Sequence, residues 1–448
     1  MKKLGGILVP HFKNTAAMRP ETLPVPAEVR LPMSMHEGAP ANPVVKTGDT
    51  VKIGQLIGEA AGAVSSPVYS SVSGKIKQID YIDSLTGKKS ITITIASDGM
   101  QEYWEGITPP VITNTAEFLE AVKNSGAVGL GGAGYPTAAK LTLKENVKLD
   151  YILVNGAECE PFISSDTRTM IDDAADLFEG MKLLQKYLDP KNVIICIEEN
   201  KPEPIAIMKK YCAGTPGMEV RKLPSLYPQG ERKVLVYNVT GRIVPEGARL
   251  PDIGCVVINC STVAAFAKYI RTGIPLVSRC ITVDGPGIVN PKNVIAPIGT
   301  PVRSLVEFCG GLKDGVKMVT LGGPMMGTAI PDLDIPVVKV TSAVLAFTEK
   351  SKSPFEAPET TACLKCGRCI VKCPMNLMPP YIENAFELKK PELLQKYKVN
   401  MCLECGCCAY TCPAKRPLVQ VMSLSKDMLW NYQAALKAAK AAEVREAQ

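Results

Sequence analysis

The 448-residue sequence has few histidines, no block of like charge and no basic cluster interleaved with aromatic residues. Its two histidines, His11 and His36, both lie near the N-terminus, so a Ser-His-Asp triad or a histidine-rich metal site lacks the residues that it needs. The net charge of +7 is mild for a chain of this length. These absences argue against triad catalysis and against nucleic acid as a partner.

Long apolar segments are also scarce. The most apolar run, residues 253–270, is interrupted by Asn259, Ser261 and Lys268, and it is too polar to cross a bilayer. The first ten residues hold two lysines and too few apolar residues for the core of a signal peptide. We therefore expect any membrane association to come through a partner.

The composition is that of a soluble globular protein, with 46% apolar and 21% charged residues. The length exceeds what a single hydrophobic core supports, so we expect three or four domains. Within residues 33–80, short β-rich pieces broken by glycines predict a small barrel of hairpins. This stretch resembles a biotinyl/lipoyl-type barrel-sandwich domain. The hairpin that carries the lysine in that family reads "AAGAVSSPVYS" here, so the resemblance implies the fold without a tethered cofactor.

From residue 113 the apolar spacing becomes helical, and strands and helices alternate. Alternation of this kind predicts an α/β layer with a parallel sheet. The expected elements are a helix at 115–126, a strand at 151–154, one amphipathic helix at 167–188, a strand at 191–200 and a strand-to-helix unit at 256–273.

The rest of the chain divides by composition. Residues 276–340 contain short strands with Gly and Pro punctuation, which predicts a small α+β module. The Pro/Glu/Ser/Thr-rich stretch "EKSKSPFEAPETTA" is typical of a linker. The tail after Trp430 is rich in Ala, Lys and Glu and predicts an exposed helix.

Two cysteine runs give the strongest chemical signal. Both follow C-x2-C-x2-C-x3-C-P, and the second repeats the first at a displacement of 39 residues. This is the spacing of bacterial ferredoxins, in which the fourth cysteine of each run ligates the other cluster. A pair of zinc sites is the alternative. The predicted ligands are Cys363, Cys366, Cys369 and Cys412 for the first 4Fe–4S cluster, and Cys402, Cys405, Cys408 and Cys373 for the second.

The remaining cysteines have no such pattern. Cys407 stands beside Cys408, but the repeat aligns it with Arg368 and leaves it outside the ligand set. The others are scattered in mostly apolar surroundings, where we interpret them as small buried hydrophobic residues.

The stretch "GLGGAGYPTAAK", residues 129–140, matches the G-x-G-x-x-G fingerprint and ends in a lysine, as a P-loop does. A Rossmann turn follows a strand, whereas these glycines follow a helix, and Lys140 is not followed by Ser or Thr. Neither the dinucleotide-binding turn nor the P-loop is therefore favoured. Tight glycine packing without a ligand is the alternative that the residues leave open.

Together with "NGAECEP", this glycine stretch is similar to the flavin site of the NADH-oxidising subunit of respiratory complex I. Nearly the whole chain, from "GGILVPHFK" to the paired cysteine motifs, resembles the RnfC family of the Rnf electron transport complex more closely. The resemblance implies a non-covalently bound FMN and NAD(H) as substrate. The implied FMN contacts are Gly129, Gly131, Gly132, Lys140, Asn155, Glu158, Gly230 and Asn259, and the implied NADH contacts are Tyr135, Glu160 and Glu231.

The same resemblance implies the domain order and the function. The expected parts are a barrel-sandwich hybrid domain at 1–105, an FMN/NADH-binding α/β domain at 106–275, a β-grasp-like module at 276–345, a linker at 346–360, a dicluster ferredoxin domain at 361–425 and a helical tail at 426–448. Electrons would pass between ferredoxin, the clusters, FMN and NAD⁺ at the cytoplasmic face of the membrane. Integral membrane and ferredoxin-accepting subunits would hold the chain there and translocate ions.

Two other functions stay open on the sequence. The domain order also resembles the cobalamin reductase of propanediol-utilisation microcompartments, which would deliver electrons to a corrinoid. Arg232 stands where the complex I protein has a second glutamate. That departure supports the other alternative, a cluster-bearing scaffold without nucleotide binding.

Overall fold

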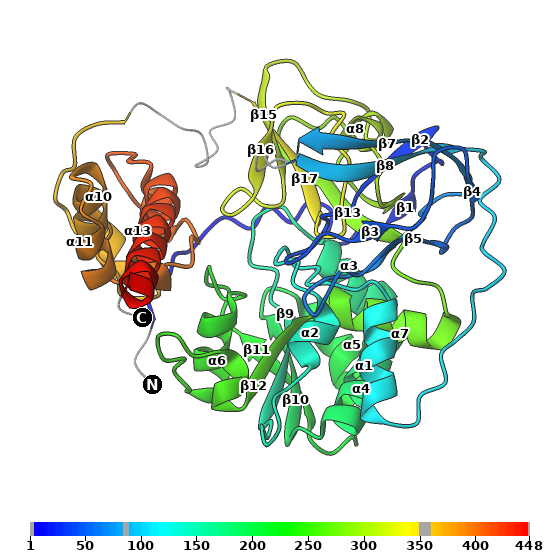
Figure 1. Cartoon of the computed structure of the whole chain (residues 1–448), viewed down its shortest axis with the longest axis horizontal. Coiled ribbons are helices and arrows are strands. Elements are labelled where there is room, and N and C mark those ends of the chain that lie inside the picture. Colours follow the sequence, from blue (N-terminus) through cyan, green and yellow to red (C-terminus); the bar gives the residue numbers. More distant parts are fainter. Residues whose placement is uncertain (1–3, 84–88, 349–359, 447–448) are drawn as a thin grey trace. The chain divides into compact units, whose positions relative to one another are not determined.

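The computed structural model describes residues 4–83, 89–348 and 360–446. They form two compact units (Figure 1). In their described parts, the larger unit comprises residues 11–225 and 242–348, and the smaller unit comprises residues 4–10, 226–241 and 360–446. Within these ranges no helix combines the length and the apolarity that a membrane crossing needs.

The N-terminal part of the larger unit is built from two antiparallel sheets, as the hairpin pattern predicts. Strands alternate between buried and partly exposed residues, and in β2 the buried positions are Val29 and Leu31. One sheet has the order β2 (Glu28–Pro32), β8 (Lys89–Ser97), β7 (Gly74–Asp83), β4 (Thr50–Val51), and the other the order β3 (Asn42–Pro43), β5 (Leu56–Glu59), β6 (Val68–Tyr69). Their inner faces share one apolar core.

A four-stranded sheet follows, and every strand pair in it is parallel, which confirms the predicted α/β layer. Its order is β11 (Met218–Leu223), β10 (Asn192–Glu198), β9 (Tyr151–Gly156), β12 (Cys255–Asn259). The central strands are almost wholly apolar because helices cover them. The helices of this layer are α1 (Thr115–Asn124), α2 (Thr137–Leu141), α3 (Ser165–Asp172), α4 (Ala174–Leu188), α5 (Pro202–Cys212) and α7 (Cys260–Thr272), with a short 3-10 turn η1 (Leu250–Ile253).

The prediction of one helix over 167–188 is wrong. The chain leaves helical geometry at Asp173, where φ is −108° and ψ is 23°, and α3 ends there. Aspartate is a poor residue for a helix interior, and Arg168 forms two hydrogen bonds with the Asp172 carboxylate at the last turn of α3.

A six-stranded mixed sheet completes the larger unit. Its edge strand comes from the N-terminal segment, because Glu21 and Thr22 pair with β14. β17 continues through Thr348, beyond the expected end of the module at 345, and residues 349–359 of the predicted linker lie outside the described residues. The order is β1 (Glu21–Thr22), β14 (Lys292–Pro297), β13 (Ser278–Asp284), β17 (Ala343–Thr348), β15 (Val316–Leu321), β16 (Thr328–Ile330), with helix α8 (Val302–Phe308).

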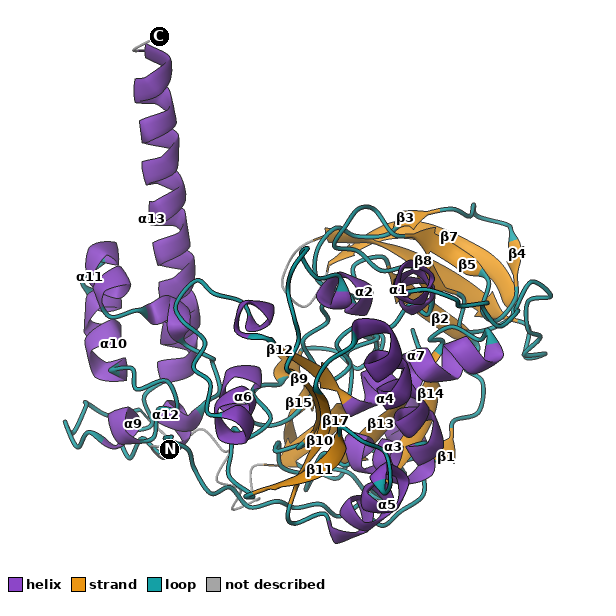
Figure 2. Ribbon diagram, turned by 90° about the horizontal axis from the view of Figure 1, so that it is seen from below, coloured by secondary structure: helices purple, strands orange, loops and turns teal. Residues whose placement is uncertain are grey.

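The smaller unit is helical and shows the sequence repeat in its backbone. Gly367 and Gly406, 39 residues apart, both have left-handed φ values, 71° and 79°, and each precedes a one-turn helix. Figure 2 shows the last helix as a single straight rod that begins beside the cysteine loops and extends past its neighbours. The helices are α6 (Arg232–Thr240), α9 (Arg368–Val371), α10 (Pro379–Glu387), α11 (Pro391–Lys396), α12 (Cys407–Tyr410) and α13 (Leu418–Glu446), with the 3-10 turn η2 (Val399–Met401).

Candidate flavin and iron–sulfur sites

The candidate flavin site lies at the carboxyl edge of the parallel sheet, where α/β proteins collect their ligand-binding loops. β9 ends at Gly156 and leads into Glu158 and Glu160, while β12 ends at Asn259. Because β9 and β12 are adjacent and parallel, residues 155–160 and Asn259 meet at this edge. The fold thus brings together two segments that stand about a hundred residues apart in the sequence.

The glycine stretch forms a closed loop held by its own backbone. The Gly129 N–H donates to the Tyr135 carbonyl (2.9 Å), and the Gly134 N–H donates to the Gly129 carbonyl (3.0 Å). Thr262, in the first turn of α7, accepts from the Leu130 N–H (3.0 Å) and donates to the Val128 carbonyl (2.9 Å). These amides are occupied within the protein, so a ligand must be bound by others.

Those other amides belong to the exposed tip of the loop, residues 131–133. In the described part of the chain, no hydrogen-bond acceptor is found for the Gly131, Gly132 or Ala133 N–H. Consecutive backbone donors in such a turn form a concave anion site. Gly131 also has no room for a side chain, since a Cβ there would lie 2.9 Å from the Asn259 Nδ2. The loop tip therefore fits the phosphate or the pyrimidine oxygens of a flavin.

A buried arginine that the sequence analysis did not select lies under this loop. Arg279, on β13, donates from Nη2 to the Leu130 carbonyl (3.1 Å). Its Nε has no hydrogen-bond partner among the described residues, and burial lowers the pKa of the guanidinium. An incompletely paired buried cation beside a donor-rich loop further favours an anionic ligand. Only its position in β13, where it is the one basic residue of "SRCITVD", could have indicated it.

Three of the predicted FMN contacts keep polar atoms at the edge. Asn259 caps α7 through its Oδ1, which accepts from the Thr262 N–H (3.2 Å), and its Nδ2 donates to Asp166 (2.7 Å). The Asn155 Oδ1 accepts from the Ala157 N–H (3.1 Å). Lys140, on α2, donates to the Val257 carbonyl of β12 at 3.4 Å, so its ammonium lies against the same sheet.

Glu158 is placed differently from the expectation of a flavin ligand. Its Oε1 accepts from the Asp166 N–H (2.6 Å), and its Oε2 accepts from the Thr167 hydroxyl (2.5 Å), so both oxygens satisfy the first turn of α3. Burial raises the pKa of this carboxyl. The residue holds α3 at the sheet edge, and neither carboxylate oxygen is left without a protein partner.

Lys13 in the opening segment organises the loop after β9, and no sequence pattern indicates this beyond its place in "GGILVPHFK". Its ammonium donates to three backbone carbonyls, those of Glu158 (2.8 Å), Glu160 (2.8 Å) and Ile163 (2.5 Å). Burial lowers the pKa of Lys13 to about 8. A charged donor that joins three carbonyls of one loop fixes the path of that loop.

The predicted NADH contacts in the larger unit have contrasting environments. Tyr135 is exposed at the mouth of the glycine loop, with 36% of its surface accessible. Glu160 is buried: its Oε2 accepts from the Met325 N–H (3.0 Å), and its Oε1 has no hydrogen-bond partner in the described chain. Burial raises the pKa of Glu160 to about 7. The turn between β15 and β16 therefore covers the carboxylate that the resemblance assigns to the ribose.

Gly230 and Glu231 belong to the smaller unit, in the loop before α6. Glu231 is the N-cap of α6, and its Oε2 accepts from the Lys233 N–H (2.6 Å) and the Val234 N–H (3.1 Å). Arg232 is solvent-exposed over 68% of its side chain. The structure gives Glu231 a helix-capping role, and the contact of this loop with a nucleotide stays a prediction.

The eight cysteines of the paired motifs gather in two cavities of the smaller unit, each enclosing about 400 Å³. The partition follows the cross-over of the fourth cysteine, since Cys412 joins the first loop and Cys373 joins the second. One cavity is lined by Cys363, Cys366, Cys369 and Cys412, and the other by Cys373, Cys402, Cys405 and Cys408. The thiols line a cavity. Within the described ranges, no group of three or more His, Cys, Asp or Glu side chains is arranged to hold a single metal ion.

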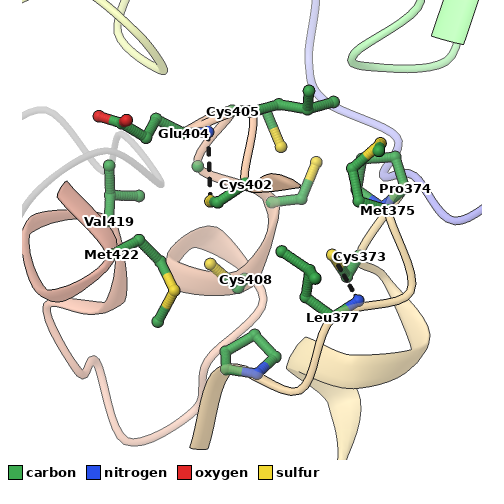
Figure 3. A pocket seen from close by; sticks show the side chains of 14 residues that line it. Cys373, Pro374, Met375, Leu377, Cys402, Glu404, Cys405, Cys408, Val419 and Met422 are labelled. Carbon is green, nitrogen blue, oxygen red and sulfur yellow. Dashed lines mark hydrogen bonds between the residues drawn. The ribbon is translucent and has the colours of Figure 1, made fainter. Parts of the chain in front are cut away.

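In the second cavity, backbone N–H groups donate hydrogen bonds to cysteine sulfurs (Figure 3). The Leu377 N–H donates to the Cys373 Sγ (3.3 Å), and the Glu404 N–H donates to the Cys402 Sγ (3.4 Å). Hydrogen bonds to the sulfurs stabilise the charge of an iron–sulfur cluster and tune its potential. Glu404 occupies a left-handed turn that the repeat shares, since Glu404 and Lys365 both have a φ of 53°. The residues therefore fit a cubane cluster.

Cys407 lines the same cavity but faces the segment before α6. It is fully buried, and its Sγ lies 3.9 Å from the Tyr227 carbonyl, to which it donates. Five of the scattered cysteines are buried as predicted, whereas Cys159 and Cys280 are partly exposed. The buried ones are Cys196, Cys212, Cys255, Cys260 and Cys309.

Comparison with known domain families agrees with this layout. The family model of the RnfC barrel sandwich hybrid domain matches residues 1–100, and that of the Nuo51 FMN-binding domain matches residues 122–268. An SLBB domain matches residues 280–329, and a 4Fe-4S dicluster domain matches residues 358–413. A chain of an NAD⁺-reducing NiFe-hydrogenase shares the fold, with 17% identity and a TM-score of 0.51 over 70% of this chain and 62% of its own.

These domains define a redox protein that uses FMN and 4Fe–4S clusters, which removes the zinc alternative. Two similar proteins define more closely the kind of redox protein to which the chain belongs. The C subunit of the proton-translocating ferredoxin:NAD(+) oxidoreductase complex of Clostridium ljungdahlii is 40% identical over 84% of this chain and 82% of its own. The C subunit of the Na(+)-translocating complex of Acetobacterium woodii is 39% identical over 84% and 85%. The chain belongs to this family, the C subunits of ion-translocating ferredoxin:NAD⁺ oxidoreductase complexes.

Proposed function

We propose that this chain passes electrons between two 4Fe–4S clusters, FMN and NAD(H) within a membrane-associated, ion-translocating ferredoxin:NAD⁺ oxidoreductase. The observation that carries the proposal is the pairing, in one chain, of a donor-rich glycine loop at a sheet edge with two cavities, each lined by the four cysteines of a predicted ligand set. When bound, FMN supplies the exchange between two-electron hydride chemistry and the one-electron clusters.

The residues contribute binding and orientation. The amides of residues 131–133 would hold an anionic or carbonyl oxygen, while Asn259 and Asn155 offer amide groups beside them. Lys140 would add a positive charge at the same edge. Tyr135, exposed beside the loop, would stack on the nicotinamide or the adenine of NADH.

The clusters divide in exposure, which bears on the partner. In the first set Cys363 and Cys366 are exposed and the other two cysteines are buried, whereas in the second set no cysteine is exposed and Cys405 is buried. We propose that the first cluster exchanges electrons with a ferredoxin-accepting subunit, and that integral membrane subunits hold the chain at the cytoplasmic face and translocate the ion. The two relatives above are named for different ions at nearly equal identity, so the overall likeness does not indicate which ion is coupled.

The test is reconstitution of the full-length chain with FMN, iron and sulfide, followed by addition of NADH. We expect bleaching of the flavin absorbance and diaphorase activity. Tyr135→Ala should raise the KM for NADH about tenfold while FMN stays bound, and Tyr135→Phe should behave as the native protein because it keeps the ring. Absence of both flavin bleaching and diaphorase activity would refute the proposal.

The assembly is tested separately. Affinity capture of the chain from detergent-solubilised membranes should bring down integral membrane subunits in fixed stoichiometry. Recovery of the chain with microcompartment shell proteins instead would indicate the cobalamin reductase function.

A further inference from the structure

The barrel-sandwich domain lacks the lysine of a carrier domain, and the structure shows what its hairpin does instead. Residues 60–67 form the hairpin tip that would carry a tethered cofactor. Gly62 and Ala63 at its apex are exposed, whereas Ser65 and Ser66 are 5% and 2% exposed, so the second half of the tip is packed inside the larger unit. A hairpin that is buried in this way cannot swing between sites, and its contacts indicate a fixed role.

The central contact of the tip is a buried lysine from another module. Lys339, in the segment between β16 and β17, is 1% exposed and has no carboxylate among its hydrogen-bond partners in the described chain. Its ammonium donates to the Ser66 hydroxyl (3.0 Å), the Pro67 carbonyl (2.6 Å) and the Gly126 carbonyl (2.8 Å). All three donors of the ammonium are thus used, two on the barrel and one just beyond the end of α1.

Gly126 lies just before the glycine loop, so this contact fixes where the loop begins. α1 ends at Asn124, and its last carbonyls need partners. The Tyr69 hydroxyl of β6 donates to the Asn124 carbonyl (2.6 Å), and the Lys339 cation meets the Gly126 carbonyl, where a helix C-terminus favours positive charge. The barrel therefore fixes the C-terminal end of α1, which precedes residues 127–135.

The barrel also fixes where the glycine loop ends. The Glu37 N–H donates to the Gly134 carbonyl (3.0 Å), and a Cβ on Gly134 would lie 3.8 Å from the His36 Cα. His36 is itself anchored to the hairpin tip, since the Ser66 N–H donates to its Nε2 (3.1 Å). Burial, with Lys339 close by, lowers the pKa of His36 to about 4, so the ring is neutral near pH 7.

We propose that the barrel-sandwich domain is a rigid platform that positions the glycine loop, and that Lys339 is the positioning residue that locks the barrel hairpin to the start of that loop. The proposal rests on the proposed function in assigning the loop to FMN. It adds a role for the barrel, because residues of the barrel contact the chain at both ends of the loop.

The test uses the full-length protein and the variant Lys339→Met, which keeps the length of the side chain and removes the three hydrogen bonds. Hydrogen exchange, followed by mass spectrometry on the FMN-free protein, should show faster exchange of the Gly129 and Gly134 amides, by on the order of tenfold, with β10 unchanged. FMN binding should weaken to a similar extent. Lys75→Met, which removes an exposed lysine from the same barrel, is the matched control and should change neither quantity.

A second variant covers the case in which Lys339→Met does not fold. Tyr69→Phe removes only the hydroxyl at the Asn124 carbonyl and should raise exchange in residues 127–135 by a smaller factor. Unchanged exchange of the loop in both variants, or in Tyr69→Phe alone if the other is unfolded, would overturn the proposal. Because exchange is measured without FMN, failure of the native protein to bind flavin would count against the proposed function and leave this readout intact.

Discussion

Gly131 and Asn259 meet at the edge of the parallel sheet, where a Cβ on Gly131 would lie only 2.9 Å from the Asn259 Nδ2. The Asn259 side-chain amide is held in place, because its Nδ2 donates to Asp166 at 2.7 Å and its Oδ1 caps α7. The tip of the glycine loop is therefore set against the end of β12. Any side chain at Gly131 must displace either the loop tip or the Asn259 amide.

We predict that Gly131→Ala weakens FMN binding on the order of tenfold and leaves the folded core intact, since the clash displaces the exposed amides of the loop tip. Quenching of flavin fluorescence on titration measures the change in Kd. Asn259→Ser shortens the side chain and keeps an N-cap residue, so the double variant should recover part of the affinity. An affinity in Gly131→Ala equal to the native value would show that the loop tip does not contact the flavin.

The cysteine repeat predicts that Cys408 is a cluster ligand and that its neighbour Cys407 is not. We predict that Cys408→Ser loses about half of the iron of the reconstituted protein, because the second cavity then keeps only three of its four predicted ligand thiols. Cys407→Ser should retain all of it, since its Sγ contacts the Tyr227 carbonyl and its place in the repeat is held by Arg368. Iron analysis and the electron paramagnetic resonance signal of the reduced protein measure both outcomes.

If Cys407→Ser loses a cluster and Cys408→Ser does not, the assignment of ligands in the second loop is reversed. If both variants lose a cluster, circular dichroism distinguishes unfolding of the protein from the loss of a ligand. A cluster retained in both would mean that either thiol can complete the set.

The two cysteine cavities illustrate what could be predicted from the sequence. Ligation by short loops depends on local spacing, so the 39-residue repeat and the exchange of Cys373 and Cys412 could be read directly. The parallel sheet was predictable for the same reason, because buried strands and amphipathic helices have local periodicity. The position of β1 in a distant sheet has no such local cause.

The buried lysines show where prediction from local sequence patterns fails. Lys13 and Lys339 occur in the sequence as ordinary lysines, and lysine is rarely buried without a paired carboxylate. Lys13 donates to backbone carbonyls of another module and lies 3.9 Å from the Glu158 carboxylate, while Lys339 donates to a serine hydroxyl and two carbonyls. These partners come together only after the chain has folded. Glu158 is a predicted flavin contact, and the structure uses both of its oxygens to start α3. A carboxylate after a strand can equally bind a ligand or cap the next helix, and local sequence does not distinguish the two.

Glu160 should make stability depend on pH between its ordinary and its folded pKa. Burial raises the pKa of Glu160 to about 7, opposed by the Met325 and Met326 N–H groups and by Lys13. Between about pH 4.5 and 7 the folded state therefore binds more protons than the unfolded state, and stability falls as pH rises through this range. The loss from this group is on the order of 3 kcal/mol and is complete above pH 7.

The comparison with Glu160→Gln isolates the effect, because the amide keeps the shape and cannot titrate. The urea midpoint of the variant, relative to that of the native protein, should rise from about pH 4.5 to 7 and then stay constant. A difference that does not change with pH would show that Glu160 titrates at its ordinary value. That result would also mean that the turn 322–327 does not keep solvent from the carboxylate.

The first cysteine loop carries positive charge that the second loop lacks. Lys365, Arg368 and Lys372 are exposed, and none forms an ion pair with another described residue. Their equivalents in the repeat are Glu404, Cys407 and Thr411, which include no cation. Two apolar side chains adjacent to these cations in the sequence, Leu364 and Val371, are 64% and 74% exposed. A cationic rim around an exposed cluster loop suits an acidic electron donor.

We predict that Arg368→Glu/Lys372→Glu slows reduction of the clusters about tenfold at low salt, measured by stopped-flow absorbance with a reduced acidic ferredoxin in place of the ferredoxin-accepting subunit. The difference from the native rate should shrink as salt screens the charges. Lys389→Glu/Lys390→Glu, which changes the same net charge just beyond the end of α10, is the control and should change the rate less than about twofold. Equal slowing by both double variants would indicate an effect of net charge alone, and no slowing by either would place electron entry away from the first loop.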